Sequence, residues 1–222
     1  MKKFALLVAG GSGSRMNSSV AKQFMELGGK PVLMHTFECF ANYDADIEFV
    51  LVLPEKEVEY WKYLCEKHRF KIGHKLAFGG KHRFQSVKNG LEMIHGEGVV
   101  FIHDGVRPLV SATTLENCYL TAIEKGNALP VVPINESVRF ADEDGNKTVD
   151  RSKYWLVQTP QTFKTEIIRK AYDQNYLEKF TDDASVLEES GETIHLVKGN
   201  RENIKITYPE DLVVARSFLF PQ

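Results

Sequence analysis

The segment FALLVAGGSGSR, residues 4–15, joins a short apolar run to a glycine-rich loop. The apolar residues at its start, 4–8, are typical of a strand that is buried on both faces of a parallel sheet. The glycines that follow let the backbone turn and direct its N–H groups toward phosphate oxygens. This segment therefore predicts a first strand that opens into an anion-binding loop.

Apolar runs alternate with helical patterns along most of the remaining chain. Further strands are expected at residues 47–53, 75–78, 99–103, 129–132 and 193–197. Helices are expected at residues 32–41, 55–68, 82–95, 114–125, 164–175 and 182–190. A final helix is expected to begin with a capping box at Thr207-Tyr208-Pro209-Glu210. This alternation indicates an α/β fold with a mainly parallel sheet, in which ligands bind beyond the carboxyl ends of the strands.

The alternation is interrupted by a polar segment at residues 133–155. A strong turn signal, Asp142-Glu143-Asp144-Gly145-Asn146, lies between two short segments at 138–141 and 147–150. This pattern predicts a protruding two-stranded β-arm. Because a lone hairpin is marginally stable in water, we expect the arm to pack on another surface, such as a second subunit.

The composition is that of one globular domain, expected to span residues 1–222. The chain is 43% hydrophobic and 26% charged, unlike disordered or coiled-coil chains. Its formal net charge of −2 disfavours a strongly basic nucleic-acid-binding protein. No apolar run approaches the roughly 18 residues that a membrane span needs. The sequence therefore predicts neither a nucleic-acid partner nor a membrane partner.

The cysteines and the N-terminal residues bear on the compartment. Cys39, Cys65 and Cys118 are far apart and form no C-x-x-C pair, so they predict small buried hydrophobes rather than a disulfide framework or a zinc site. Two lysines before the first apolar run resemble the start of a signal peptide. That run is too short, however, and no cleavage site of small residues follows it. We therefore expect a cytoplasmic protein.

Polar turns follow the first and fourth expected strands. In the first turn, Arg15 and the nearby Lys22 add positive charge beside the phosphate-binding glycines; the alternative is a tight turn with surface basic residues. In the later turn, at 104–108, Asp104 is well placed to hold Mg²⁺ or a ribose. Arg107 would neutralise a phosphate or fix the aspartate. The alternative is an ordinary turn residue with its ion-pair partner.

A third turn, at residues 79–86, follows the third expected strand. Gly79 and Gly80 would let a base approach the backbone, where Ser86 or Arg83 would read it. The alternative is a turn followed by the start of a helix.

Better-known glycine motifs are incomplete in this chain. Met16 stands where a G-x-G-x-x-G dinucleotide motif needs its third glycine, and Pro31 follows Gly29-Lys30 where a phosphate-binding Walker loop needs Ser or Thr. Ser14 occupies the last glycine position of a G-x-S-x-G nucleophile elbow. A dinucleotide dehydrogenase, a P-loop enzyme and a serine hydrolase are therefore disfavoured.

Several segments, taken in order, resemble one enzyme family. They are A-G-G-S-G-S-R-M, A-K-Q-F, H-D-G-V-R-P, V-D-R, Q-T-P-Q-x-F, T-D-D-A-S-V-L-E and N-I-K-I-T-x-P-E-D-L, between about Ala5 and Ala215. The pattern is similar to that of the 2-C-methyl-D-erythritol 4-phosphate cytidylyltransferases of the non-mevalonate isoprenoid pathway. Ribitol-5-phosphate cytidylyltransferases share most of it.

The resemblance implies a fold, a reaction and a set of site residues. The fold would be a Rossmann-like nucleotidyltransferase domain that forms a homodimer through the arm. The reaction would join CTP to a polyol phosphate with release of pyrophosphate, with Mg²⁺ held at Asp104. Arg15, Lys22 and Lys205 would be the catalytic cations. The residues expected at the nucleotide are Ala9, Gly10, Gly11, Ser12, Gly13, Gly79, Gly80, Arg83, Ser86 and Asp104. Those expected at the second substrate are Asp104, Arg107, Ser137, Arg151, Thr159, Thr181 and Lys205, with Arg151 reaching across from the partner subunit.

The chain departs from the family pattern at two places, and alternatives remain. Glu136-Ser137 stands where the family usually has Asp-Thr on the arm, and Gly105-Val106 where it usually has Ala-Ala. The nearest alternative is the same chemistry on ribitol 5-phosphate, and a second is a nucleotide-binding module without turnover. The second is disfavoured because the chain holds all four of Arg15, Lys22, Asp104 and Lys205. A nicotinamide oxidoreductase is disfavoured by the missing third glycine.

The expected chemistry gives a first prediction. A phosphate monoester is already dianionic at neutral pH because its second pKa is about 6, so no general base is needed. Catalysis would then consist of positioning two polyanions and stabilising charge. We expect Arg15→Met or Lys22→Met to lower the rate on the order of 100- to 1000-fold with the fold intact, as measured by pyrophosphate release and circular dichroism. A near-wild-type rate in either variant would exclude the assigned role.

Overall fold

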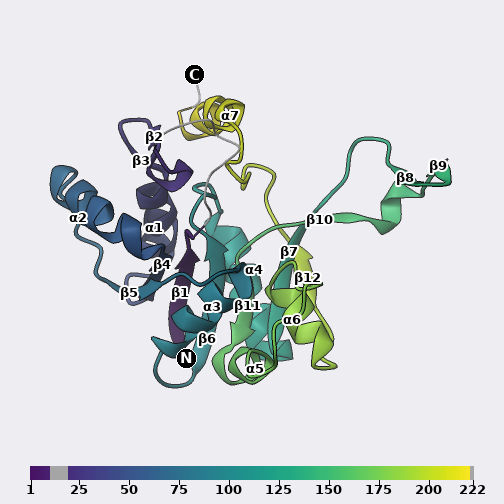
Figure 1. Cartoon of the computed structure of the whole chain (residues 1–222), viewed down its shortest axis with the longest axis horizontal. Coiled ribbons are helices and arrows are strands. Elements are labelled where there is room, and N and C mark those ends of the chain that lie inside the picture. The colour runs from purple at the N-terminus through teal and green to yellow at the C-terminus, as the bar shows by residue number, and fades with distance from the viewer. Residues whose placement is uncertain (11–19, 221–222) are drawn as a thin grey trace.

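The computed structural model describes residues 1–10 and 20–220 (Figure 1). Its strands are β1 (Lys2–Val8), β2 (Glu26–Leu27), β3 (Lys30–Pro31), β4 (Glu48–Leu53), β5 (His74–Phe78), β6 (Gly98–Asp104), β7 (Asn127–Pro133), β8 (Arg139–Asp142), β9 (Gly145–Thr148), β10 (Trp155–Val157), β11 (Gln161–Lys164) and β12 (Leu196–Lys198). Its α-helices are α1 (Val32–Tyr43), α2 (Val58–Lys67), α3 (Arg83–Glu92), α4 (Ala112–Lys125), α5 (Thr165–Ala171), α6 (Asp183–Glu189) and α7 (Pro209–Leu219).

An eight-stranded sheet forms the centre of the molecule. Its order is β10-β7-β11-β6-β1-β4-β5, with β12 also paired to β7. The strands β1, β4, β5 and β6 are mutually parallel, and β12 is parallel to β7, whereas β10 and β11 run antiparallel to their neighbours. The predicted α/β fold with a mainly parallel sheet is confirmed.

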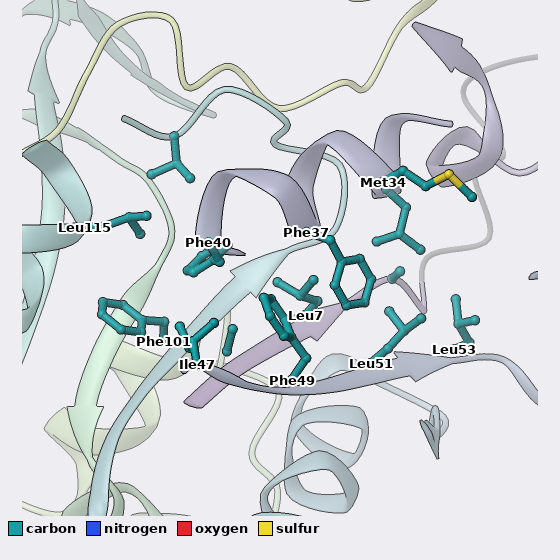
Figure 2. Packing of buried hydrophobic residues seen from close by; sticks show 14 of the residues in the cluster. Leu7, Met34, Phe37, Phe40, Ile47, Phe49, Leu51, Leu53, Phe101 and Leu115 are labelled. Atoms are coloured by element: carbon teal, nitrogen blue, oxygen red, sulfur yellow. The ribbon is translucent and has the colours of Figure 1, made fainter. Parts of the chain in front are cut away.

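The first strand is buried on both faces, as its continuous apolar run predicts. Ala5 and Leu7 point to one side, into a cluster with Phe37 and Phe40 of α1, where the rings pack over the sheet (Figure 2). Helices α2 and α4 contribute to the same cluster. Phe4, on the opposite side of β1, packs in a second cluster with residues of α3, α5 and α6. The sheet is therefore a middle layer between two layers of helices.

Strand β11 is absent from the sequence-based expectations. It inserts antiparallel between β6 and β7, and its first three residues are buried although two of them are polar. Gln161 is buried because its side chain donates to Asp182 Oδ2 at 2.7 Å and accepts from the Ala184 backbone N–H at 2.7 Å. Those partners lie far along the chain, so the local pattern does not indicate a strand.

Some element ends differ from the expected ones. The capping box of α7 lies one residue later than predicted: Asp211, not Glu210, accepts from the backbone N–H groups of Thr207 and Tyr208, at 2.7 and 2.8 Å. Helix α5 ends at Ala171, earlier than the expected 164–175, and β12 begins later than the expected 193–197.

The expected arm is present. Strands β8 and β9 pair antiparallel around Glu143-Asp144, every residue of both strands is exposed, and the hairpin projects from the body of the molecule (Figure 1). The paired segments are shifted by one to two residues from the expected ones. The shift arises because Gly145, at a φ of +131°, allows a tighter turn than expected.

The cysteines are free thiols. Cys118 is buried as predicted, whereas Cys39 and Cys65 are half-buried against the α1 side of the core. Burial raises the pKa of Cys39 and of Cys118 to about 12 and that of Cys65 to about 11, so little thiolate forms near neutral pH. Over the part of the chain that the structure describes, no helix combines the length and the apolar character needed to cross a bilayer.

Helix α3 approaches the sheet closely at Gly90. A Cβ atom there would lie 2.4 Å from Leu6 Cδ1 and 2.8 Å from Val52 Cγ2, so the helix needs glycine for this contact. We expect Gly90→Val to destabilise the fold by about 1–3 kcal/mol through over-packing. Gly73→Val is the matched control, because open space surrounds Gly73. Urea denaturation measures both variants, and equal midpoints would contradict the close contact.

Candidate active site

A pocket of about 210 Å³ lies at the carboxyl ends of the parallel strands. Sheet register brings these ends together: Val8 pairs with Asp104 and with Val52. The backbone N–H of Ala9 donates to Val52 O at 2.9 Å, and that of Gly79 donates to Leu53 O at 2.8 Å. The lining residues are Val8, Ala9, Gly10, Lys22, Gln23, Gly80, Lys81, His82, Arg83, Ser86, Asp104, Val106 and Lys205. Gly10, at the start of the first predicted turn, therefore lies beside residues of the other two predicted turns.

The turn after β5 is closed by Ser86. Its hydroxyl accepts from the Gly80 backbone N–H at 3.0 Å and donates to His82 O at 3.1 Å. A Cβ on Gly10 or Gly79 would lie within 3.6 Å of Ser86 Oγ, so both glycines face this hydroxyl across the pocket wall. The Ser86 hydroxyl therefore lies between the turn after β1 and the turn after β5 and holds the second of them in shape.

Arg83 lines the pocket but is held from behind. Its two terminal nitrogens each donate to a different oxygen of the fully buried Asp183, at 2.6 Å, and the Tyr172 hydroxyl donates to the same carboxylate at 2.6 Å. Burial lowers the pKa of Arg83, but the charge of Asp183 outweighs this effect, and the net pKa is raised. Arg83 therefore ties α3 to α6, and its contact with a nucleotide stays a prediction.

Asp104 lies among cations at the end of β6. Its Oδ2 is 2.9 Å from Lys205 Nζ and 3.4 Å from Arg107 Nε. Burial raises the pKa of the Asp104 carboxyl, but the positive charges of Lys205, Arg83 and Arg107 outweigh it and hold the pKa well below its usual value. The carboxylate is therefore ionised and balances part of a strongly positive site.

The donor set bears on the expected Mg²⁺. Asp104 is the single carboxylate among the described residues that line the pocket, and no group of three or more metal-binding side chains occurs within residues 1–10 and 20–220. Mg²⁺ is commonly held by one or two carboxylates together with substrate phosphates. The residues present therefore fit a Mg²⁺ that arrives with a triphosphate, rather than one enclosed by protein ligands.

The other predicted substrate residues lie outside the lining of this pocket. Arg107 and Thr159 sit behind Asp104, where the Thr159 hydroxyl accepts from the Asp104 backbone N–H at 3.1 Å. Ser137 and Arg151 are exposed on the arm and its base, and Thr181 is exposed just before α6. Gly11, Ser12, Gly13 and Arg15 lie outside the described residues.

Sequence reasoning missed polar residues that hold the pocket in shape. Gln23, next to Lys22, is buried and donates to Ala9 O at 3.0 Å and to Glu57 Oε2 at 2.5 Å. His103 and Asn203 are fully buried on the other side of the pocket. They lie in the quoted motifs A-K-Q-F, H-D-G-V-R-P and N-I-K-I-T, but polar letters in a motif do not show whether a side chain faces a ligand or the protein.

A mainly parallel sheet whose strand ends gather glycine turns, cations and one buried aspartate defines an α/β nucleotidyltransferase fold. The family model described as "IspD: 2-C-methyl-D-erythritol 4-phosphate cytidylyltransferase" matches residues 4–220, and the chain therefore belongs to this family of cytidylyltransferases. This confirms the resemblance seen in the sequence.

Individual relatives match along nearly the whole chain. The 2-C-methyl-D-erythritol 4-phosphate cytidylyltransferase of Bacteroides fragilis is 51% identical, over 99% of this chain and 100% of the relative. That of Porphyromonas gingivalis is 50% identical, over 98% of each chain. Among solved structures, 4-diphosphocytidyl-2C-methyl-D-erythritol synthase from Anaerococcus prevotii aligns with a TM-score of 0.83 at 27% identity, covering 98% of this chain and 96% of that one. The bifunctional IspDF from Campylobacter jejuni aligns with a TM-score of 0.81 at 28% identity, covering 96% of this chain and 54% of that one.

The ion pair behind the pocket yields a stability prediction. Removing one partner of a buried ion pair costs about 3–5 kcal/mol, and because the Arg83 side chain is 27% exposed we expect Asp183→Ala to fall toward the lower end. Glu59→Ala is the control, since the Glu59–Lys62 pair at 2.7 Å is exposed and such pairs contribute little. Urea denaturation compares the two, and similar losses would show that the Asp183 contact is not the anchor described.

Proposed function

We propose that this chain transfers the cytidylyl group of CTP to 2-C-methyl-D-erythritol 4-phosphate, giving 4-diphosphocytidyl-2-C-methyl-D-erythritol and pyrophosphate. The observation that carries the proposal is the family match over residues 4–220, with relatives about half identical along their whole length. The pocket supports it, because glycine turns and cations at parallel strand ends fit a nucleoside triphosphate.

The reaction needs no proton acceptor from the protein. A dianionic phosphate oxygen of the acceptor attacks the α-phosphorus of CTP, the bond from that phosphorus to the bridging oxygen of the β-phosphate breaks, and pyrophosphate carries away the electron pair. His103, directly before Asp104, is not suited as a base: burial lowers its pKa to about 4, and both ring nitrogens are engaged by Thr159 Oγ1 and Arg107 O, at 3.0 Å each.

Cations of the pocket would carry the catalysis. Lys22, from the N-terminal part of the chain, and Lys205, from the C-terminal part, both line the pocket. The family pattern adds Arg15 as a further triphosphate contact. Positive groups fixed around the α-phosphorus stabilise the extra charge of the transition state without reorganisation. Mg²⁺, with Asp104 as its protein ligand, would neutralise charge on the triphosphate.

We include in the proposal a homodimer formed through the arm. Trp155, Leu156 and Val157 of β10 are roughly half exposed, and a groove of about 800 Å³ at the root of the arm is lined mostly by apolar side chains of β7, β10 and β12. A second copy laid on this surface would bury it. Ser137 and Arg151 do not line the pocket of their own chain, and the arm projects from the body (Figure 1). The same two residues of the partner subunit would then supply the acceptor contacts.

The proposed compartment is the cytoplasm. Three free cysteines, none paired in a disulfide, are consistent with a reducing environment.

Substrate choice tests the proposal directly. We expect the purified chain with CTP and Mg²⁺ to release pyrophosphate with 2-C-methyl-D-erythritol 4-phosphate and to be inactive with ribitol 5-phosphate; omission of the acceptor is the control. Activity with ribitol 5-phosphate alone would retain the chemistry and overturn the substrate. No release with either acceptor would overturn the assigned activity.

A further inference from the structure

An irregular loop delivers one of the proposed catalytic cations. Residues 199–207 connect β12 to α7 without regular secondary structure, and Lys205 lies near the end of this loop with its Nζ 2.9 Å from Asp104 Oδ2. A helix or strand fixes its side chains through a backbone hydrogen-bond ladder, whereas this loop needs other contacts to hold Lys205 in place.

Asn203 supplies several of those contacts, beside the backbone hydrogen bond from Ile206 N–H to Val106 O at 2.9 Å. It is fully buried, and its side-chain Nδ2 donates to Thr159 O at 2.7 Å. Its own backbone carbonyl accepts from Arg107 Nη1 at 2.8 Å and from Gln158 Nε2 at 3.4 Å. Through one residue, the loop of Lys205 is therefore bonded both to the turn that contains Arg107 and to the segment that precedes β11.

Further hydrogen bonds link those two segments to Asp104. The Thr159 hydroxyl accepts from the Asp104 backbone N–H at 3.1 Å and donates to His103 Nδ1 at 3.0 Å. Because burial keeps the imidazole neutral, the remaining ring proton sits on Nε2 and donates to Arg107 O at 3.0 Å. Each of these three hydrogen bonds has one donor and one acceptor, and together they connect the turn at Asp104 to the segment that contains Thr159.

The choice of an amide at position 203 also points to a directional role. Asn203 Oδ1 is buried without a hydrogen-bond partner among the described residues, and so is Gln158 Oε1. Burying an unpaired acceptor is unfavourable, and an apolar side chain would fill the same space without that cost. The amides are therefore explained by their N–H donors, which fix the loop, rather than by packing alone.

We propose that Asn203 is a positioning residue for the acceptor substrate, supported by Gln158. It sets the place of Lys205 relative to Asp104 and Arg107 without touching the substrate itself. This inference rests on the proposed function and on the family resemblance, which places Asp104, Arg107 and Lys205 at the second substrate and Asp104 at the nucleotide as well. The nucleotide side of the pocket is fixed separately, through Gly79 N–H to Leu53 O and Ser86 to Gly80, and Asp104 is held by the pairing of β6 with β1. A change at Asn203 is therefore expected to affect the acceptor more than CTP.

The test is steady-state kinetics of the full chain with Asn203→Ala. A displacement of about 1 Å at reacting groups costs about 100-fold in rate, so we expect kcat/KM for 2-C-methyl-D-erythritol 4-phosphate to fall about 10- to 100-fold with a raised KM. The KM for CTP is expected to stay close to the wild-type value. Gln158→Met, which keeps the side-chain length but removes the N–H donors, is expected to change the same parameter in the same direction, and it serves if Asn203→Ala does not fold.

Asn127→Ala is the matched control. Asn127 is equally buried, donates to Thr193 O at 2.8 Å and accepts from the His195 backbone N–H at 3.0 Å. Asn127 pairs with Phe163, and Phe163 pairs with Val100, which lies four residues before Asp104 along β6. Asn127 therefore lies toward the other ends of the strands, away from the pocket. We expect this variant to lose stability while both KM values are retained.

The outcomes separate the inference from the proposed function. If the wild-type chain and Asn127→Ala turn over the substrate but Asn203→Ala and Gln158→Met keep both KM values, or raise them equally, the positioning role is overturned and the activity stands. If the wild-type chain shows no turnover, the proposed function fails and this inference fails with it.

Discussion

The parallel pairing of β1 with β6 is the contact on which the site depends. It places Val8 level with Asp104. Strand β4, on the other side of β1, reaches the same level because Val52 pairs with Val8. Because β1, β4 and β6 end at the same level, the described residues that follow β1 and β6 lie close together and line a pocket. The core serves this arrangement: α1 and α3 clamp opposite faces of β1 and keep the strand ends in register.

Electrostatics then decides what this edge can hold. A buried carboxylate is unfavourable unless cations surround it, and Asp104 is paired with Lys205 and close to Arg107 and Arg83. The same pairing keeps Lys205 directed into the pocket, whereas Arg107 is held behind Asp104. Arg83 is the reverse case, a cation held by a buried carboxylate: Asp183 fixes its guanidinium at the pocket wall. The site is thus organised in advance for anionic ligands, which is what transfer between two phosphate compounds requires.

Much of the fold could be predicted from the sequence, because periodicity and glycine turns are local signals. The buried first strand, the helices on both faces and the arm all follow from such patterns. Strand β11 could not be predicted, since the burial of Gln161 depends on a carboxylate at Asp182. The anchoring of Arg83 depends on a partner 100 residues away. In the candidate site, the order of motifs located the ligand-facing turns, but residues such as Asn203, whose bonds run to the protein, carry no local sign of that role.

The two halves of the site are built in different ways, and this difference has a consequence for substrate choice. The proposed nucleotide half consists of strand ends and the first turns of helices, which the core fixes. The proposed acceptor half would depend on the irregular loop at 199–207, held in part by side-chain amides, and on the arm that projects from the body. Changes in a loop or an exposed arm cost little stability compared with changes in a packed core. A fold of this design would therefore retain one nucleotide while its acceptor changes, and the departures at Glu136 and Ser137 fall on the arm.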